Sequence, residues 1–354
     1  MNCHDIRHLP QSRTRRRCKK LRQDGFTLVE ILACTFLLGL LMVLLSPTIR
    51  DGYSAVMRAA NGRQALNNQN IASVLLDSVR TQSLLGQLPP PYSGSSFRST
   101  VLDPSDSGLV GLFTQAGMLP RDVNTDGTAA QNVRVYQRAN GLTMQVPLYF
   151  RSGPLVTLSY QVGVVYSTRC GVYDGGCSTG PSGVPGASPA LTAANALNWA
   201  PADPDYGAQV FSTLQLQRSM LQTTVTNLDL IRDNFQNYYR ESERLASATD
   251  TTNWYPAPSS SLAGQNPLVN QGCYDGWYDL SNSTVNVLAQ IGMDQARYGK
   301  TQWGGPLQYC RDYKPTATGA NKVPHYGAIR IHTNVSAGSS PDSSTPANNV
   351  VLTF

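Results

Sequence analysis

Seven cysteines give this chain its clearest capacity for chemistry. Three lie near the N-terminus (Cys3, Cys18 and Cys34), and four lie further along the chain: Cys170, Cys177, Cys273 and Cys310. In an oxidising compartment an even set of cysteines favours disulfides, and a zinc site is disfavoured because the chain has no C-x-x-C pair and few histidines. The four cysteines allow three pairings. We favour Cys170–Cys177 and Cys273–Cys310 because each pair falls within one half of the chain.

The segment Asp122–Gly127, with the sequence DVNTDG, is a candidate metal site. Oxygen-bearing side chains at alternate positions, followed by glycine, are typical of the start of a calcium-binding loop. An EF-hand is not present, because Val133 occupies the position of the bidentate glutamate. Two interpretations stay open: a calcium site formed by Asp122, Asn124 and Asp126, or a polar turn without metal, which we favour. No other cofactor is predicted.

Other kinds of chemistry find little support in the sequence. The chain has no G-x-S-x-G motif and only four histidines, so we do not expect an enzyme. The net charge of +6 comes from residues 1–25, which hold eight basic and two acidic residues. That leaves 20 of each sign in residues 26–354. Because the larger part is neutral, no direct binding to nucleic acid is expected.

The segment Phe26–Leu45 is strongly apolar, with Thr27, Glu30, Thr35 and Gly39 as its exceptions. About 20 residues match the thickness of a bilayer, so the pattern predicts a single membrane-spanning helix. The basic residues before it predict a cytoplasmic N-terminus and an exported remainder. No small-residue cleavage site follows, which disfavours an ordinary secretory signal. A plain signal anchor leaves Glu30 unexplained, because a carboxylate is costly in lipid.

The motif Gly25–Glu30 (GFTLVE), followed by an apolar stretch, resembles the class III leader junction of type IV prepilins and type II secretion pseudopilins. The resemblance implies that a prepilin peptidase cleaves between Gly25 and Phe26 and methylates the new N-terminus at Phe26. It also implies an assembly role for Glu30, which neutralises the freed amino group of a neighbouring subunit. Pro47 lies where many members of the family have a helix-kinking proline.

The remaining pattern predicts the elements that position these residues. Helical periodicity continues from 48 to about 85, and a second amphipathic helix is expected over 206–245. A short helix is expected over 109–118. Strands are expected over 133–137, 142–150, 155–167, 326–333 and 350–354, with hairpin turns at 138–141 and 151–154. These elements favour an α+β fold. With the resemblance, the expectation is a pilin-like lollipop, in which a long N-terminal transmembrane helix packs on an antiparallel β-sheet, plus a second helix-led C-terminal domain.

The predicted organisation has five parts. They are a leader (1–25) removed on processing, a transmembrane half-helix (26–47), an amphipathic half-helix with a first pilin-like head (48–174), a linker rich in Gly, Pro, Ser and Ala (175–205), and a disulfide-containing domain (206–354). Ten aromatic residues of the last part either fill its core or, if exposed, bind glycans or a partner. We favour the interpretation that these aromatic residues fill the core.

The resemblance implies a structural subunit of a type IV pilus-like filament, and the length of the chain favours a minor, tip-proximal one. The alternatives are a type II secretion or DNA-uptake pseudopilin, and a pilus-tip adhesin that binds through its C-terminal half. The implied partners are prepilin peptidase, other pilin or pseudopilin subunits, the inner-membrane assembly platform and the inner membrane. The precursor would lie in the inner membrane, and the mature chain in the periplasm or at the cell surface within a filament.

Overall fold

The computed structural model describes residues 28–80, 85–91, 107–119, 134–149, 152–167, 189–202, 207–247, 249–259, 271–273, 276–315 and 323–354. The chain divides into two units, Met1–Ala59 and Ala60–Phe354.

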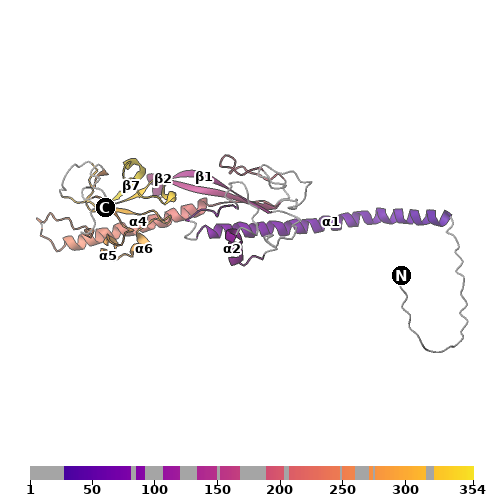
Figure 1. Cartoon of the computed structure of the whole chain (residues 1–354), viewed down its shortest axis with the longest axis horizontal. Helices are drawn as coiled ribbons and strands as arrows, with labels where there is room; N and C mark the ends of the chain where they lie inside the picture. Colours follow the sequence, from indigo (N-terminus) through magenta and orange to yellow (C-terminus); the bar gives the residue numbers. More distant parts are fainter. Residues whose placement is uncertain are drawn as a thin grey trace, which may run out of the picture. The chain divides into compact units, whose positions relative to one another are not determined.

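Helix α1, Leu28–Ser78, begins in the first unit and ends in the second (Figure 1). In the first unit its apolar side chains are between 49 and 72% exposed; they are Leu32, Phe36, Leu37, Leu38, Leu40, Leu41, Met42 and Val43. In the second unit the side chains of Ile71 and Leu75 are fully buried. The helix ends earlier than the predicted residue 85, and the chain turns at Leu85 and Gly86, which both have positive φ angles.

The predicted membrane-spanning helix, a part of the predicted fold class, is wrong. Among the residues that the structure describes, no helix is both long enough and apolar enough to cross a bilayer. Helix α1 is long, and charged residues lie on either side of its apolar segment: Glu30 near its start, and Arg50, Asp51, Arg58 and Arg63 after Pro47. The α+β class and the antiparallel sheets are confirmed.

A long hairpin forms the middle of the second unit. Its strands are β1 (Arg134–Tyr149) and β2 (Ser152–Ser167), and β2 also pairs with the short strand β3 (Gln209–Ser212). The turn predicted at 138–141 is instead an irregularity within β1, where the register shifts between Ala139 and Leu142. Gly141 adopts a φ of 79° there, a conformation that glycine tolerates and that lets the strand continue past the extra residue.

One half of the hairpin packs against the end of α1. Tyr136 of β1 and Val165 of β2 share a buried cluster with Ile71 and Leu75 of α1. Phe113 of α2 (Ser107–Gln115) closes this cluster. The Tyr136 hydroxyl donates a hydrogen bond to the Pro89 carbonyl at 2.9 Å, so the buried phenol is satisfied. The predicted packing of the helix end on an antiparallel sheet is therefore present in this unit.

The hairpin also buries part of the predicted linker. Leu191, Ala196 and Trp199 pack against β1 and β2. The Trp199 ring lies 5.6 Å from the ring of Tyr166, and its indole nitrogen donates to the Pro189 carbonyl at 2.7 Å. Residues 189–202 are thus part of the folded unit, although their composition is typical of a linker.

The other half of the hairpin packs against α4, Leu214–Glu243. This helix begins later than the predicted residue 206, because Gln209–Ser212 pair with β2 instead. Its buried face includes Leu228, Ile231 and Phe235, which contact Leu148 of β1 and Leu158 of β2 within one cluster. The hairpin therefore joins the α1 end of the second unit to its C-terminal part (Figure 1).

A second antiparallel sheet completes the unit. Its strand order is β4-β5-β6-β7, formed by Tyr278–Asp279, Gln308–Cys310, Ala328–His332 and Asn349–Thr353. Its inner face packs on α4, where the ring of Phe235 stacks on Tyr309 at 4.7 Å. Short helices connect the strands: α5 (Val287–Gln290), α6 (Gln295–Tyr298), η4 (Val335–Ala337) and η5 (Pro346–Asn348).

Candidate functional site

Several residues predicted to be functional lie outside the described residues, so their roles stay predictions. They are the cleavage pair Gly25 and Phe26, the candidate calcium ligands Asp122, Asn124 and Asp126, and the first predicted cysteine pair, Cys170 and Cys177. Among the residues that are described, no group of three or more His, Cys, Asp or Glu side chains could hold a metal ion.

Glu30 and Pro47 both belong to α1. Pro47 lies inside the helix, where it lacks the backbone donor that would otherwise bond to the preceding turn. Glu30 belongs to the first turn, where the helix dipole favours a negative charge. The exposed apolar side chains within residues 32–43 follow directly, so this part of α1 presents a group of large apolar side chains on its surface.

The predicted disulfide Cys273–Cys310 is present. Its sulfur atoms are 2.08 Å apart, and it joins cysteines 37 residues apart in the sequence. Cys310 is the last residue of β5, so the bond fastens Cys273 to the outer face of the β4–β7 sheet. Both cysteines are fully buried there with Trp277 and Ala328.

The aromatic residues of the C-terminal part mostly fill its core. Tyr255, Trp277, Trp303 and Tyr309 are at most 5% exposed. Trp303 donates its indole hydrogen to the Gln217 side chain at 2.7 Å. The core interpretation therefore holds for these four, while Tyr326 is 46% exposed.

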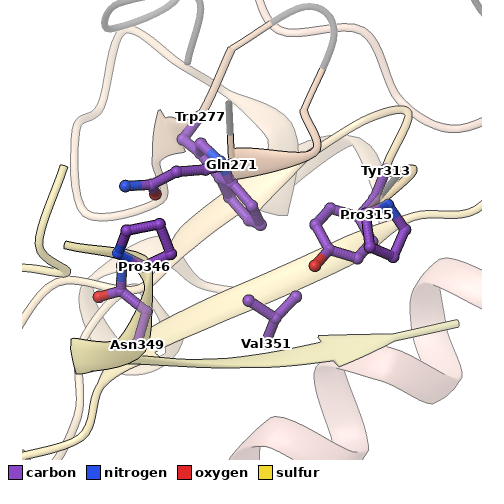
Figure 2. A pocket seen from close by; sticks show the side chains of 7 residues that line it. All are labelled: Gln271, Trp277, Tyr313, Pro315, Pro346, Asn349 and Val351. Carbon is purple, nitrogen blue, oxygen red and sulfur yellow. The ribbon is translucent and has the colours of Figure 1, made fainter. Parts of the chain in front are cut away.

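A hollow of about 310 Å³ lies over the outer face of the β4–β7 sheet (Figure 2). Its apolar walls are Trp277, Tyr313, Pro315, Pro346 and Val351. The amide side chains of Gln271 and Asn349 also line it. In Figure 2 the Trp277 ring points toward Val351, and the Tyr313 hydroxyl points toward the middle of the hollow.

Beneath the Trp277 ring lies the buried guanidinium of Arg330. Its carbon is 4.3 Å from the ring centre, an arrangement that a cation–π attraction stabilises. Arg330 donates to the side-chain oxygens of Gln271 and Gln308, the second at 2.7 Å. Burial lowers the pKa of Arg330 to about 10. No carboxylate of the described residues lies within ion-pair distance of this cation.

The loop that begins at Asp342 borders the hollow and is held by hydrogen bonds. Gln271 donates to the carbonyls of Asp342 and Ser343 at 3.2 and 2.8 Å, and Asn349 donates to the Asp342 carbonyl at 2.6 Å. The Asp342 carboxylate accepts hydrogen bonds from Ser344, Thr345 and Asn348 at 2.7 to 3.0 Å. These bonds hold the pKa of Asp342 well below its usual value.

A second polar contact joins the turn after β5 to the loop that follows α4. The Nδ1 atom of His325 lies 2.9 Å from Asp312 Oδ2, and its Nε2 atom lies 3.0 Å from the Thr251 carbonyl. Burial raises the pKa of Asp312, while the hydrogen bond from His325 opposes that shift. This contact links residues from three segments of the chain, and we assign it a structural role.

The hollow and its buried cation were not predicted from the sequence. Arg330 lies in a strand predicted over 326–333, but nothing in its neighbours marks it as buried. The alternation of Ile329, Arg330 and Ile331 is that of a sheet with one face in solvent. Trp277 covers Arg330 on that second face, and its position depends on contacts distant in sequence.

Comparison of the chain with protein-family models, with curated proteins and with solved structures gives no match.

Proposed function

We propose that this protein is a structural subunit of a type IV pilus-like filament, matured by a prepilin peptidase and assembled through α1. The observation that carries the proposal is the GFTLVE motif at residues 25–30, whose last three residues begin a helix with exposed apolar side chains. Cleavage after Gly25 would make Phe26 the first residue of the mature chain, two residues before α1 begins.

The exposed surface of α1 supports assembly through this helix. Eight large apolar side chains within residues 32–43 are about half exposed or more. Burying one such side chain contributes about 1.5–3 kcal/mol, so an isolated chain has a strong driving force to cover this surface. Neighbouring α1 helices of the same filament would cover it, and the charge of Glu30 would neutralise the amino terminus of an adjacent subunit.

The structure of the second unit supports the proposal that this unit lies outside the helical core of the filament. It has its own hydrophobic clusters, two antiparallel sheets and a disulfide, so it is folded independently of any contact through residues 32–43. On this proposal the partners are the prepilin peptidase, other pilin or pseudopilin subunits and the assembly platform. A bulky second unit favours a low-copy, tip-proximal subunit over a repeated one, because repeated copies would clash along the shaft.

The first test is mass spectrometry of the N-terminal peptide of the chain, produced with and without a prepilin peptidase. We expect a peptide that begins at N-methylated Phe26 only when the peptidase is present. A Gly25→Leu variant should stay uncleaved, because the larger side chain replaces the small residue at the junction. A Gly39→Leu variant is the matched control and should be cleaved normally, because a side chain at Gly39 meets no atom within 4 Å. An intact leader in both samples would contradict the proposal.

A type II secretion or DNA-uptake pseudopilin is the second candidate, since the same motif serves both kinds of assembly. The localisation of the mature chain separates the two. A filament subunit is recovered from sheared surface filaments, whereas a pseudopilin stays in the cell-envelope fraction.

A further inference from the structure

The dipeptide Asn140–Gly141 lies at the irregularity of β1, within the long hairpin. Pairing with β2 runs as far as Ala139 and resumes at Leu142, so neither residue of the dipeptide has a partner residue in β2. Gln161 is the residue of β2 that lies opposite, but its backbone bonds to Thr213. Its N–H donates to the Thr213 hydroxyl at 2.9 Å, and its carbonyl accepts from the Thr213 N–H at 3.0 Å. The dipeptide is therefore held less firmly than the regular strand on either side of it.

An asparagine followed by glycine can react with its own backbone. The glycine nitrogen attacks the side-chain carbonyl carbon of the asparagine, a five-membered succinimide ring forms, and ammonia leaves with the proton of that nitrogen. Water then opens the ring and restores the peptide N–H, which leaves aspartate or isoaspartate. Glycine favours the reaction because it has no side chain to block the approach and because its backbone is the most adaptable.

The surroundings of Asn140 permit this reaction in the folded chain. Asn140 and Gly141 are both exposed, so water reaches them. Gly141 has a φ of 79°, and a Cβ atom there would meet no atom within 4 Å, so the space around its backbone is open. The side-chain oxygen of Asn140 accepts a hydrogen bond from Gln161 Nε2 at 2.8 Å. That hydrogen bond draws electrons from the carbon atom that the glycine nitrogen attacks.

The carboxylate would form close to a cation that lacks a counter-ion. Arg138 is half-buried and forms no ion pair with any residue that the structure describes. It donates to the Leu88 carbonyl, and the Leu88 N–H donates to the Gln161 side chain at 2.6 Å. Gln161 in turn donates to Asn140, so all four residues belong to one hydrogen-bond network. A negative charge at position 140 stabilises the cation and strengthens the hydrogen bond from Gln161.

We propose that Asn140 is a site of spontaneous deamidation in the folded chain, and that the carboxylate formed there compensates the charge of Arg138. The modification strengthens the contact between the hairpin and Leu88, which follows the end of α1. This inference does not depend on the filament proposal, because every group that it uses belongs to the second unit.

The chain contains its own control, because a second Asn–Gly dipeptide, Asn61–Gly62, lies inside α1. There the glycine N–H is bonded to the preceding turn, and the ring can close only after the helix opens locally. The test incubates the folded full chain at mildly alkaline pH, digests it with trypsin and follows the mass gain of peptides 139–151 and 59–63 by mass spectrometry. We expect Asn140 to react at least about tenfold faster than Asn61. In denaturant the two should react at similar rates, because the helix no longer protects one of them.

An Asn140→Asp variant reproduces the aspartate product and tests its effect on stability. Its thermal midpoint should rise by roughly 1–2 °C at low salt, and the rise should shrink at high salt because the attraction to Arg138 is screened. Arg138→Gln removes the cation, so adding Asn140→Asp to that variant should give no rise. This double-mutant cycle separates the charge effect from any loss of stability that Arg138→Gln causes by itself.

Three outcomes would overturn the proposal. Equal rates at Asn140 and Asn61 in the folded chain would show that the irregularity of β1 does not favour the reaction. No mass gain of peptide 139–151, under conditions in which the denatured chain reacts, would exclude the site. An unchanged or lower thermal midpoint for Asn140→Asp would exclude the compensation of Arg138.

Discussion

At the scale of single residues, the outer face of the β4–β7 sheet is organised by side chains that bond across long sequence distances. Gln271 contacts Arg330 and the Asp342 loop, while Cys273 is bonded to Cys310. Arg330, a strand residue with alternating apolar neighbours, becomes a buried cation because Trp277 covers it. The chemistry of this face therefore depends on which side chains the fold brings together.

Asp342 gives a pH-dependent prediction at this scale. Four hydrogen bonds from its own loop lower the pKa of its carboxyl group below the usual value of about 3.9. Because the unfolded chain binds the proton first as pH falls, the stabilisation is fully present above about pH 4 and is lost as the pH falls below that value. In an Asp342→Asn variant we expect the thermal midpoint to depend less on pH between about 5 and 2.

The matched control is Ser343→Ala, a neutral change in the same loop. It should keep the pH dependence of the unchanged chain. Identical pH profiles for Asp342→Asn and the unchanged chain would show that the carboxylate does not contribute in this way.

At the scale of elements, the long hairpin explains how the second unit is held together. One half of it shares a cluster with α1 and α2, and the other half shares a cluster with α4 and the second sheet. A further link joins α4 to the residues after α1. Gln217 accepts from Trp303 at 2.7 Å and donates to the Gly86 carbonyl at 2.6 Å. Each of these contacts joins elements that are distant in sequence.

Gly299, at the end of α6, gives a prediction at this scale. A Cβ atom there would lie 2.7 Å from the carbonyl oxygens of Gln295 and Leu280, which belong to the backbone and cannot move aside easily. We expect Gly299→Ala to lower the free energy of unfolding by roughly 1–3 kcal/mol, as overpacking does. Denaturant unfolding measures this change.

Gly111→Ala in α2 is the matched control, because a Cβ atom there meets no atom within 4 Å. Alanine should instead stabilise the helix by about 0.5–1 kcal/mol relative to glycine. If Gly299→Ala and Gly111→Ala had the same stability, the result would contradict the close packing around Gly299.

At the scale of the whole molecule, the two units differ in the exposure of their apolar side chains. The second unit buries them in clusters, while the described part of the first unit exposes them along α1. The proposed filament explains why apolar side chains of α1 are exposed in a single chain, because the α1 helices of neighbouring subunits would cover them.

This proposal predicts the effect of charges placed on α1. A Leu37→Asp, Leu41→Asp double variant should be absent from sheared filaments, because two carboxylates would have to be buried between subunits. The thermal midpoint of the second unit should not change, since the α1 residues described as buried in it lie at 68 and beyond. Leu197→Asp, at a leucine that is 77% exposed in the second unit, is the control and should assemble normally. Assembly of the double variant at the normal level would contradict a role for this surface.

Local patterns in the sequence were sufficient for much of the fold. The positions of α4, β6 and β7 follow from hydrophobic periodicity, since side chains repeat every 3.6 residues in a helix and every second residue in a strand. Turn residues were less reliable: Arg138–Gly141 has the composition of a hairpin turn, yet it lies within β1. The pairing with β2 on both sides of it continues the strand there, which the local sequence does not reveal.

The sequence by itself determined the GFTLVE motif at residues 25–30, the apolar stretch that follows it and the α+β class, because these depend on residue type and on local periodicity. The pairing of Cys273 with Cys310 was predicted because both cysteines lie in the same half of the chain. Only the tertiary structure decided that residues 189–202 are packed, that one hairpin connects two clusters, and that Trp277 covers Arg330 beside a hollow. These features arise from contacts between residues far apart in the chain. The geometry of packing determines which residues meet, and the local sequence does not indicate these pairs.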